Sequence, residues 1–161
     1  MSDPTLRLRH ATAADALSYV ETLLAENDLP SADVRSTPGA FYVADVADEA
    51  DGAGVDDSEA GSHVGVGGVE IYGPDGLLRS VVVERSLRGY GFGDALCEAL
   101  EREARADGVD TLYLLTTTAR GFFADRGFVE IDRTDVPAAI RGTSQFTDRC
   151  PTTAACLRKS L

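Results

Sequence analysis

The sequence lacks several features, and each absence narrows the class of protein. No apolar stretch reaches about 18 residues, so we expect no membrane-spanning helix. The segment Met1–Pro4 lacks the basic and apolar regions of a signal peptide. Three cysteines without paired spacing argue against a disulfide framework and indicate a reducing, cytoplasmic location. Two histidines and no C-x-x-C pair give no basis for a metal site, so we predict none.

Lysine is nearly absent, and acidic residues are in excess. The 161 residues include 27 acids and 15 bases, only one of them a lysine (Lys159), for a net charge of −12. This sign disfavours binding to nucleic acid, whose phosphates attract basic surfaces. Because the acids are spread along the chain, we interpret them as halophilic adaptation: at 1 M salt the Debye length is about 3 Å, which screens self-repulsion. The alternatives are simple solubility or attraction of a basic partner.

Periodic patterns predict one α/β domain spanning residues 1–161, since 43% of the residues are hydrophobic and no repeat occurs. The segment 45–62 has seven acids, no bases and several glycines, which predicts a flexible acidic loop. The expected elements, in order, are a strand at 6–8, a helix from about 12 to 25, strands at 41–46, 64–71 and 77–83, a helix that stops at Gly108, a strand at 111–116, a short helix within 119–126 and a tail strand at 155–157.

A glycine-rich turn lies between the strand that ends at Val83 and the helix that follows. Strand, glycine turn and helix N-terminus together make an anion site, because backbone N–H groups and the helix dipole favour negative charge. The spacing does not fit a Walker loop, which needs Gly-Lys-Ser/Thr, nor a dinucleotide fingerprint, because the third glycine comes one residue early.

The spacing does fit Arg-x-x-Gly-x-Gly, with Arg88, Gly91 and Gly93 at the defined positions. This pattern resembles the coenzyme A pyrophosphate loop of the GNAT superfamily of N-acetyltransferases. A second motif follows in order: a strand at 111–116 and then a short helix that closes with Gly127-Phe128. The resemblance implies the GNAT acyl-CoA N-acyltransferase fold, a mixed central sheet with helices on both faces. It also implies acetyl-CoA as the cosubstrate.

The resemblance also implies roles for individual residues at the cofactor. Backbone N–H groups of the glycine turn would bind the pyrophosphate, with charge from Arg88 or Arg85. The strand that carries Val81 and Val83 would pair with the pantetheine arm, and the backbone N–H of Val82 or Val83 would donate to the thioester oxygen. Phe123 lies where many members carry the tyrosine that protonates the leaving thiolate. Either the proton comes from another donor, namely Tyr113, Tyr42, a threonine of 116–118 or water, or the thiolate leaves without a dedicated acid. The expected cofactor-binding residues are Val81, Val82, Val83, Arg88, Gly89, Tyr90, Gly91, Phe92, Gly93 and Phe123.

The acceptor amine arrives as an ammonium, so a base must remove a proton. Glu70 is the candidate catalytic residue, because it lies in the strand before the glycine turn and alternation separates it from its apolar neighbours Val69 and Ile71. The alternative is a glutamate that faces solvent on a half-exposed strand.

Further motifs resemble a smaller branch, the arsenic-resistance N-acetyltransferases. These are the segments 77–81, 112–119 and 136–141, with Cys150-Pro151 and Cys156 in the tail. The branch implies a small-molecule amine substrate, such as a toxic arsenical or phosphinic analogue of glutamate. The residues that could bind its carboxylate or oxyanion are Arg79, Ser80, Thr117, Arg141 and Thr143. Metalloid binding by the three cysteines is a further alternative. The opposing interpretation is that Cys97 is a core residue of its helix.

Two other functions stay open at the level of sequence. Because Phe123 replaces a tyrosine, the chain could be a sensor or degenerate domain that binds acetyl-CoA without transferring its acetyl group. An acetyltransferase of proteins or peptides is the other alternative, since an acidic surface attracts basic peptides. Relatives commonly dimerise, which implies a homodimer as an expected partner arrangement.

Overall fold

The computed structural model forms two compact units, each of which combines separate stretches of the chain. The first unit comprises Met1–Gly68 and Ser80–Leu100, and the second comprises Val69–Arg79 and Glu101–Leu161. The two units are described separately. The structure describes residues 6–27, 34–36, 39–46, 63–89, 91–116, 119–142 and 155–161.

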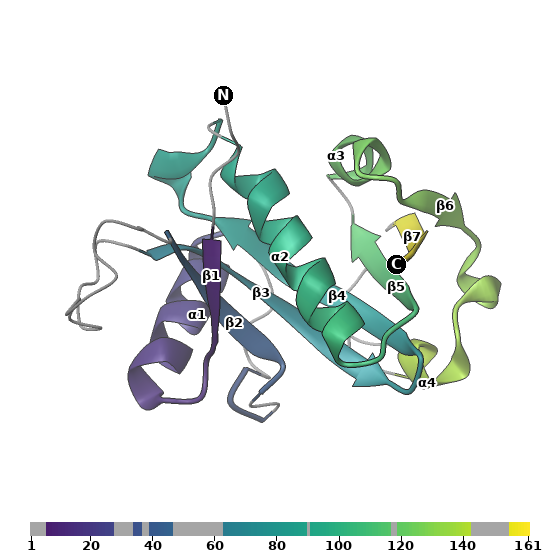
Figure 1. The fold of residues 1–161 in the computed structure, drawn as a ribbon, viewed down its shortest axis with the longest axis horizontal. Helices are drawn as coiled ribbons and strands as arrows, with labels where there is room; N and C mark the ends of the chain where they lie inside the picture. Colours follow the sequence, from purple (N-terminus) through teal and green to yellow (C-terminus); the bar gives the residue numbers. More distant parts are fainter. Residues whose placement is uncertain are drawn as a thin grey trace. The chain divides into compact units, whose positions relative to one another are not determined.

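The first unit is built on the strands near the N-terminus (Figure 1). Antiparallel pairs join β1 to β2 and β2 to β3, and the end of β4 is the next neighbour of β3. Its elements are β1 (Leu6–His10), α1 (Ala14–Glu26), the 3₁₀ turn η1 (Val34–Ser36), β2 (Phe41–Val46), the first part of β3 (His63–Tyr72), the last part of β4 (Asp75–Val83), the 3₁₀ turn η4 (Arg85–Leu87) and the first part of α2 (Phe92–Ala106).

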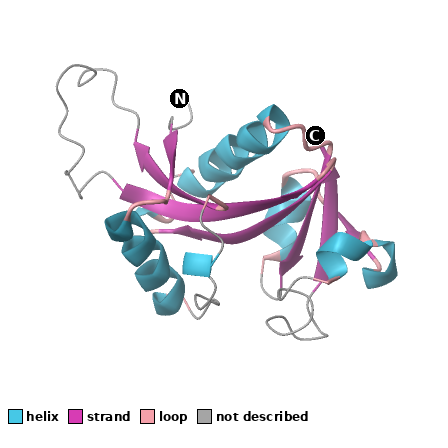
Figure 2. Cartoon of the chain, turned by 90° about the horizontal axis from the view of Figure 1, so that it is seen from below, coloured by secondary structure: helices cyan, strands magenta, loops and turns pink. Residues whose placement is uncertain are grey.

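Helices cover both faces of this part of the sheet, as the family resemblance implied (Figure 2). On one face, α1 packs against alternate strand residues, among them Val43, Val66 and Val82. On the other face, α2 approaches so closely that a Cβ added at Gly67 would lie 2.5 Å from the Leu100 side chain. Adjacent residues 66 and 67 thus face opposite helices. Such alternation is expected for a strand that is buried on both faces.

The second unit continues β3 and β4 and adds the C-terminal strands (Figure 1). In it β4 pairs in parallel with β5 over Asp75–Leu77, and β7 lies between β5 and β6, antiparallel to both. The strand order of the mixed sheet is β1-β2-β3-β4-β5-β7-β6. The further elements of this unit are the end of α2, β5 (Thr111–Thr116), α3 (Arg120–Asp125), β6 (Val129–Ile131), the 3₁₀ turn η5 (Arg133–Asp135), α4 (Ala138–Arg141) and β7 (Ala155–Ser160).

A buried acid in α2 pairs with the single lysine of the sequence. Glu101 is 5% exposed and accepts hydrogen bonds from Lys159 Nζ (2.8 Å) on β7 and from Arg126 Nη2 (3.2 Å). Within the second unit, Lys159 therefore joins α2 to β7, and Arg126 joins α2 to the C-terminus of α3. A buried carboxylate is tolerated only when it is paired in this way.

The predicted order of elements is confirmed, with additions. The sequence reading missed β6 and α4, because segments of three and four residues are too short to show a periodicity. The tail strand extends to Ser160, since it pairs with β5 along its whole length. Gly108 ends the preceding helix as predicted, with φ at +92°.

The predicted acidic loop, residues 45–62, includes two residues that belong to a strand. Asp45 and Val46 belong to β2, and Asp45 is buried at 8% exposure. Its carboxylate is held by Arg9 on one neighbouring strand and by His63 on the other, so the position is structural. Residues 47–62 lie outside the described part of the chain.

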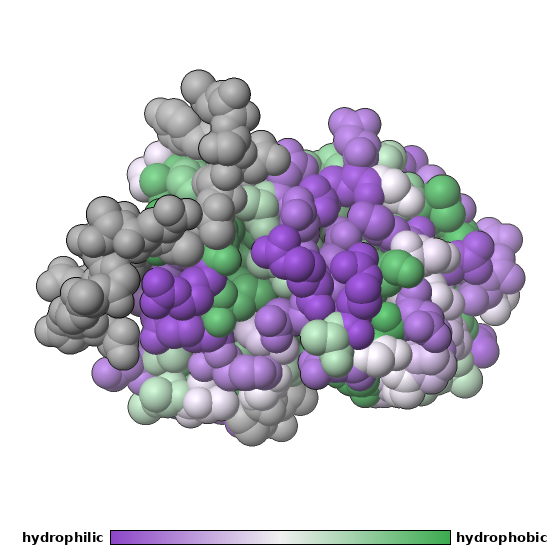
Figure 3. All heavy atoms as spheres, viewed as in Figure 1, coloured by the Kyte–Doolittle hydropathy of each residue, from purple (hydrophilic) through white to green (hydrophobic). Residues whose placement is uncertain are grey.

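No helix in the described part of the chain is long and apolar enough to cross a membrane. On the face shown in Figure 3, hydrophilic residues cover much of the described surface, with apolar residues in small patches.

Candidate coenzyme A site

The glycine-rich turn forms the link between β4 and α2 in the first unit. Gly89 and Gly91 have φ values of +88° and +86°, a region that residues with a Cβ rarely occupy. A Cβ at Gly89 would meet no atom within 4 Å, so this glycine is required by its backbone conformation and not by crowding. Two left-handed residues near each other turn the chain sharply from the strand into the helix.

The helix that follows begins at Phe92, inside the motif. Its first turn has N–H groups without helical acceptors, and the positive end of the helix dipole adds to their attraction for an anion. Gly93 is half-buried and Asp94 is exposed, so the one acid of the first turn faces solvent as expected. Tyr90 lies outside the described residues. A left-handed turn followed by a helix N-terminus is an arrangement that binds anions in other proteins.

The Arg88 side chain makes two hydrogen bonds at the start of this loop. Its Nε donates to the Val83 carbonyl oxygen at 3.1 Å, and its Nη2 donates to Asn27 Oδ1 at 2.6 Å. Asn27 is the C-cap of α1, so the loop is tied to the strand before it and to a helix far away in sequence. No local pattern predicts the Asn27 contact, because the two residues are 61 positions apart.

The predicted pantetheine strand contains one unusual backbone conformation. Ser80 has a φ of +59°, which is uncommon for a residue other than glycine and indicates a local irregularity within β4. Beyond it Val82 is 6% exposed and packs against α1, while Val81 and Val83 are half-buried. The three valines thus alternate, and the two half-buried residues point away from the α1 core.

Glu70, the predicted base, lies in the second unit and is not a solvent-facing glutamate. Its side chain is 12% exposed, and its carboxylate accepts hydrogen bonds from Arg79 Nη1 (2.7 Å) and from the hydroxyl of Tyr72. Burial and the nearby carboxylate raise the pKa of Tyr72 above its ordinary value, so this phenol stays protonated and remains a donor. Glu70 and Tyr72 are two positions apart on β3, the spacing that places side chains on one face of a strand.

The predicted substrate residues differ in their burial and in their partners. Arg79 has a side chain that is 1% exposed and pairs with Glu70, so it forms a buried ion pair with the predicted base. Ser80 is half-buried, and Arg141 is exposed at the end of α4. Thr117 and Thr143 lie outside the described residues, as does Cys150.

The position of the expected tyrosine is part of an aromatic cluster in the second unit. Phe123 is 8% exposed, and its ring meets Phe122 and Phe128 edge to face, with centroids 5.0 and 5.5 Å away. Of the suggested replacements, Tyr113 and Tyr42 are both buried, and burial raises the pKa of the Tyr113 phenol. Cys97 and Cys156 are both buried, which confirms Cys97 as a core residue.

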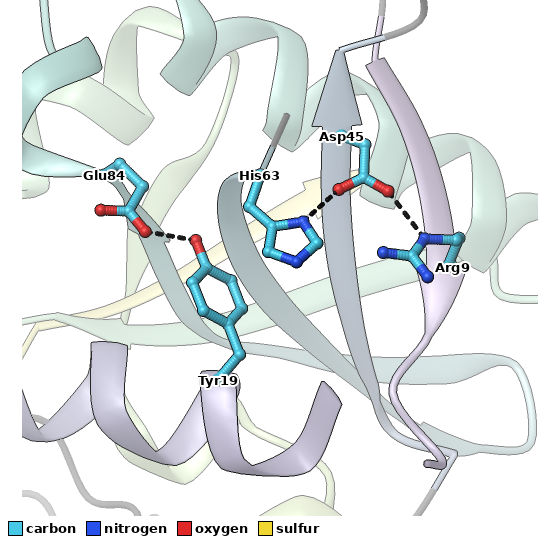
Figure 4. Close-up of polar contacts among 5 residues, drawn as sticks. All are labelled: Arg9, Tyr19, Asp45, His63 and Glu84. Carbon is cyan, nitrogen blue, oxygen red and sulfur yellow. Dashed lines mark hydrogen bonds and ion pairs between the residues drawn. The ribbon is translucent and has the colours of Figure 1, made fainter. Parts of the chain in front are cut away.

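A second polar cluster, all within the first unit, extends from β1 across β2 and β3 to the residue that follows β4 (Figure 4). Asp45 accepts from Arg9 Nε at 2.7 Å and meets His63 Nδ1 at 2.5 Å. The His63 ring lies against the Tyr19 ring, with centroids 4.6 Å apart, and the Tyr19 hydroxyl donates to Glu84 Oε2 at 2.5 Å. Burial and the contact with Glu84 raise the pKa of the Tyr19 phenol above its ordinary range.

The mixed sheet, the strand–turn–helix and the ordered arginine define an acyl-coenzyme A-binding class of fold. A family model described as an acetyltransferase (GNAT) domain matches residues 38–130. The chain belongs to the GNAT acetyltransferase family.

Relatives and solved structures extend this comparison. An amino-acid acetyltransferase of Mycobacterium tuberculosis is 35% identical over 81 residues, which are 50% of this chain and 46% of that protein. N-acetylglutamate synthase from Neisseria gonorrhoeae, complexed with coenzyme A and L-arginine, has a TM-score of 0.75 at 16% identity over 99% of this chain and 34% of that chain. Rv2747 from Mycobacterium tuberculosis, in complex with CoA and NLQ, has a TM-score of 0.71 at 20% identity over 98% and 99%. The chain spans less than half the length of the curated relatives it matches.

Proposed function

We propose that this protein transfers the acetyl group of acetyl-CoA to the primary amine of a small, amino-acid-like molecule. The observation that carries the proposal is the Arg88–Gly93 turn, with its left-handed glycines and ordered arginine, in a chain of the GNAT family. The similarity to amino-acid acetyltransferases supports an α-amine as the acceptor.

Acetyl-CoA would supply an activated thioester. The N–H groups of the turn and of the first turn of α2 would bind the pyrophosphate, and a backbone N–H of Val82 or Val83 would polarise the thioester carbonyl. The acceptor nitrogen attacks the carbonyl carbon, a C–N bond forms and the C–S bond breaks, and the thiolate leaves. Glu70, directly or through water, takes the proton that the amine loses.

Two hydrogen bonds fix the orientation of the candidate base. Tyr72 and Arg79 hold the carboxylate in one orientation, and the Glu70 side chain keeps 12% of its surface exposed, so that a proton can reach it. On this view Arg79 serves the base and does not bind the substrate carboxylate. That task falls to the other expected residues, Ser80, Thr117 and Arg141.

The finer substrate assignment follows the arsenic-resistance resemblance. N-acetylation needs an amine, so inorganic arsenite is excluded and an arsenical or phosphinic analogue of glutamate is the chemically sensible toxin. Glutamate and such analogues share an α-amine and an anionic group, so one site can bind both.

The test is thiol release from acetyl-CoA with a panel of amines, in buffers from 0.1 M to about 3 M KCl. The panel holds glutamate, glutamine, the phosphinic and arsinic analogues, polyamines and basic peptides. We expect turnover on the amino-acid group. Glu70→Gln should lower kcat by about 10²- to 10⁴-fold while the Kd for coenzyme A is unchanged. Binding of coenzyme A without turnover on any amine would favour the sensor, the function that Phe123 supports.

A further inference from the structure

Two side-chain bridges join α1 to the segment that leads from β4 into the phosphate loop. Asn27 Oδ1, at the C-terminus of α1, accepts a 2.6 Å hydrogen bond from Arg88. On the same helix, the Tyr19 hydroxyl donates to Glu84 at 2.5 Å. Glu84 follows β4 directly and Arg88 opens the Arg-x-x-Gly-x-Gly pattern, so the bridges hold both ends of the segment Glu84–Arg88. All of these residues belong to the first unit.

The bridge at Asn27 fixes a cation at the start of the anion site. The Asn27 amide nitrogen donates to the Leu23 carbonyl oxygen at 2.8 Å, which orients its own side chain. The bonds from Arg88 to Asn27 and Val83 use two of the five N–H donors of a guanidinium. Arg88 can therefore bind an anion without releasing either partner.

The bridge at Tyr19 fixes an anion beside the same loop. Tyr19 is held by the His63 ring, and His63 by Asp45, as Figure 4 shows. The Glu84 backbone N–H donates to the Val64 carbonyl oxygen at 2.7 Å, so strand pairing fixes its main chain. Tyr19 turns the Glu84 carboxylate toward α1. A carboxylate released from this bond would repel an incoming pyrophosphate.

We propose that α1 positions the phosphate loop for coenzyme A, with Asn27 and Tyr19 as the positioning residues. They act through Arg88 and Glu84, which they order before the cofactor binds. Ordering a long side chain only on binding weakens affinity by about twofold to tenfold. The proposal rests on the coenzyme A site of the proposed function, but it does not depend on turnover.

The test is isothermal titration of coenzyme A into the wild type, Asn27→Ala, Tyr19→Phe and a control. The control is Glu21→Gln, because Glu21 also lies on α1 but pairs at 3.0 Å with the exposed Arg35. We expect the Kd to rise about threefold to tenfold in the first two variants and to stay within about twofold in the control. In an Arg88→Gln background, Asn27→Ala should add less than about twofold. Pantetheine, which lacks the pyrophosphate, should bind all four proteins equally in an NMR titration.

Several results would overturn the proposal. These are a Kd within twofold of wild type in Asn27→Ala or Tyr19→Phe, an equal loss of pantetheine affinity, or an undiminished Asn27→Ala effect in the Arg88→Gln background. Tyr19→Phe removes one oxygen atom and keeps the ring, so the test survives if the Asn27 variant unfolds on thermal denaturation. A wild type that binds coenzyme A without turnover refutes the proposed enzyme alone, and one that does not bind refutes both.

Discussion

Replacement of Arg79 by methionine tests the ion pair around the candidate base. The Arg79 side chain is 1% exposed and that of Glu70 is 12% exposed, with 2.7 Å between Nη1 and Oε2. Removal of one partner from a buried pair costs about 3–5 kcal/mol, because the other charge is left without compensation. A domain of this kind has about 5–15 kcal/mol of stability, so the loss is a large fraction of the total.

The assay is urea denaturation followed by circular dichroism. With a slope of about 2 kcal/mol per molar urea, the expected loss moves the midpoint down by about 2 M. The matched control is Arg120→Met in the same unit, since Arg120 and Glu130 are 3.6 Å apart and their side chains are 61% and 53% exposed. Such an exposed pair contributes about 0–1 kcal/mol, so the control should lie close to the wild type.

A double variant separates charge from packing. Glu70→Met with Arg79→Met removes both charges, so most of the stability should return, to within about 1–2 kcal/mol of the wild type. A loss below about 1 kcal/mol in Arg79→Met alone would refute the reasoning that the pair is desolvated. A double variant as unstable as the single one would show that lost packing, and not the orphaned carboxylate, sets the cost.

Three further predictions concern pH, backbone packing and salt. The pKa of the Tyr19 phenol is raised in the folded state. Its contribution to stability is therefore complete below the unfolded pKa of about 10 and is lost as the pH rises above that value. Tyr19→Phe should flatten the fall in melting temperature between pH 9 and pH 11, and an unchanged slope would contradict this. Gly65→Ala places a Cβ 2.2 Å from the Val82 carbonyl oxygen and should cost about 2–4 kcal/mol in urea denaturation, whereas Gly121→Ala, with nothing within 4 Å, should be neutral or stabilising. If the net charge of −12 reflects halophilic adaptation, the melting temperature should rise between 0.1 M and about 3 M KCl, and a constant value would count against it.

Local patterns predicted most of the fold. The strands at 41–46 and 77–83 and the helix that stops at Gly108 were readable because apolar residues repeat with the period of one element. The phosphate turn was readable because two of its glycines, Gly89 and Gly91, have positive φ values, a requirement that the backbone sets within a few residues. The short elements β6 and α4 were not, since their pairing partners and packing decide them.

The partners of the candidate site were beyond the reach of the sequence. The Arg79–Glu70 pair and the Arg88–Asn27 bond join residues that are 9 and 61 positions apart, and nothing local signals either contact. Tyr72 could have been found, because a hydroxyl two positions after Glu70 shares its face of the strand. Asp45 looked like the start of an acidic loop, and only its cross-strand partners Arg9 and His63 show that it is buried.

The element types and the glycine turn follow from the sequence alone, because both depend on interactions within a few residues of the chain. The tertiary structure decided which charged side chains are buried, which partners neutralise them and which helix holds the phosphate loop. These depend on contacts between distant segments, where the cost of desolvating a charge is met only if a partner is brought within hydrogen-bond distance. Arg79 is an example. The sequence alone predicts that it binds substrate, and in the folded protein its buried side chain pairs with Glu70.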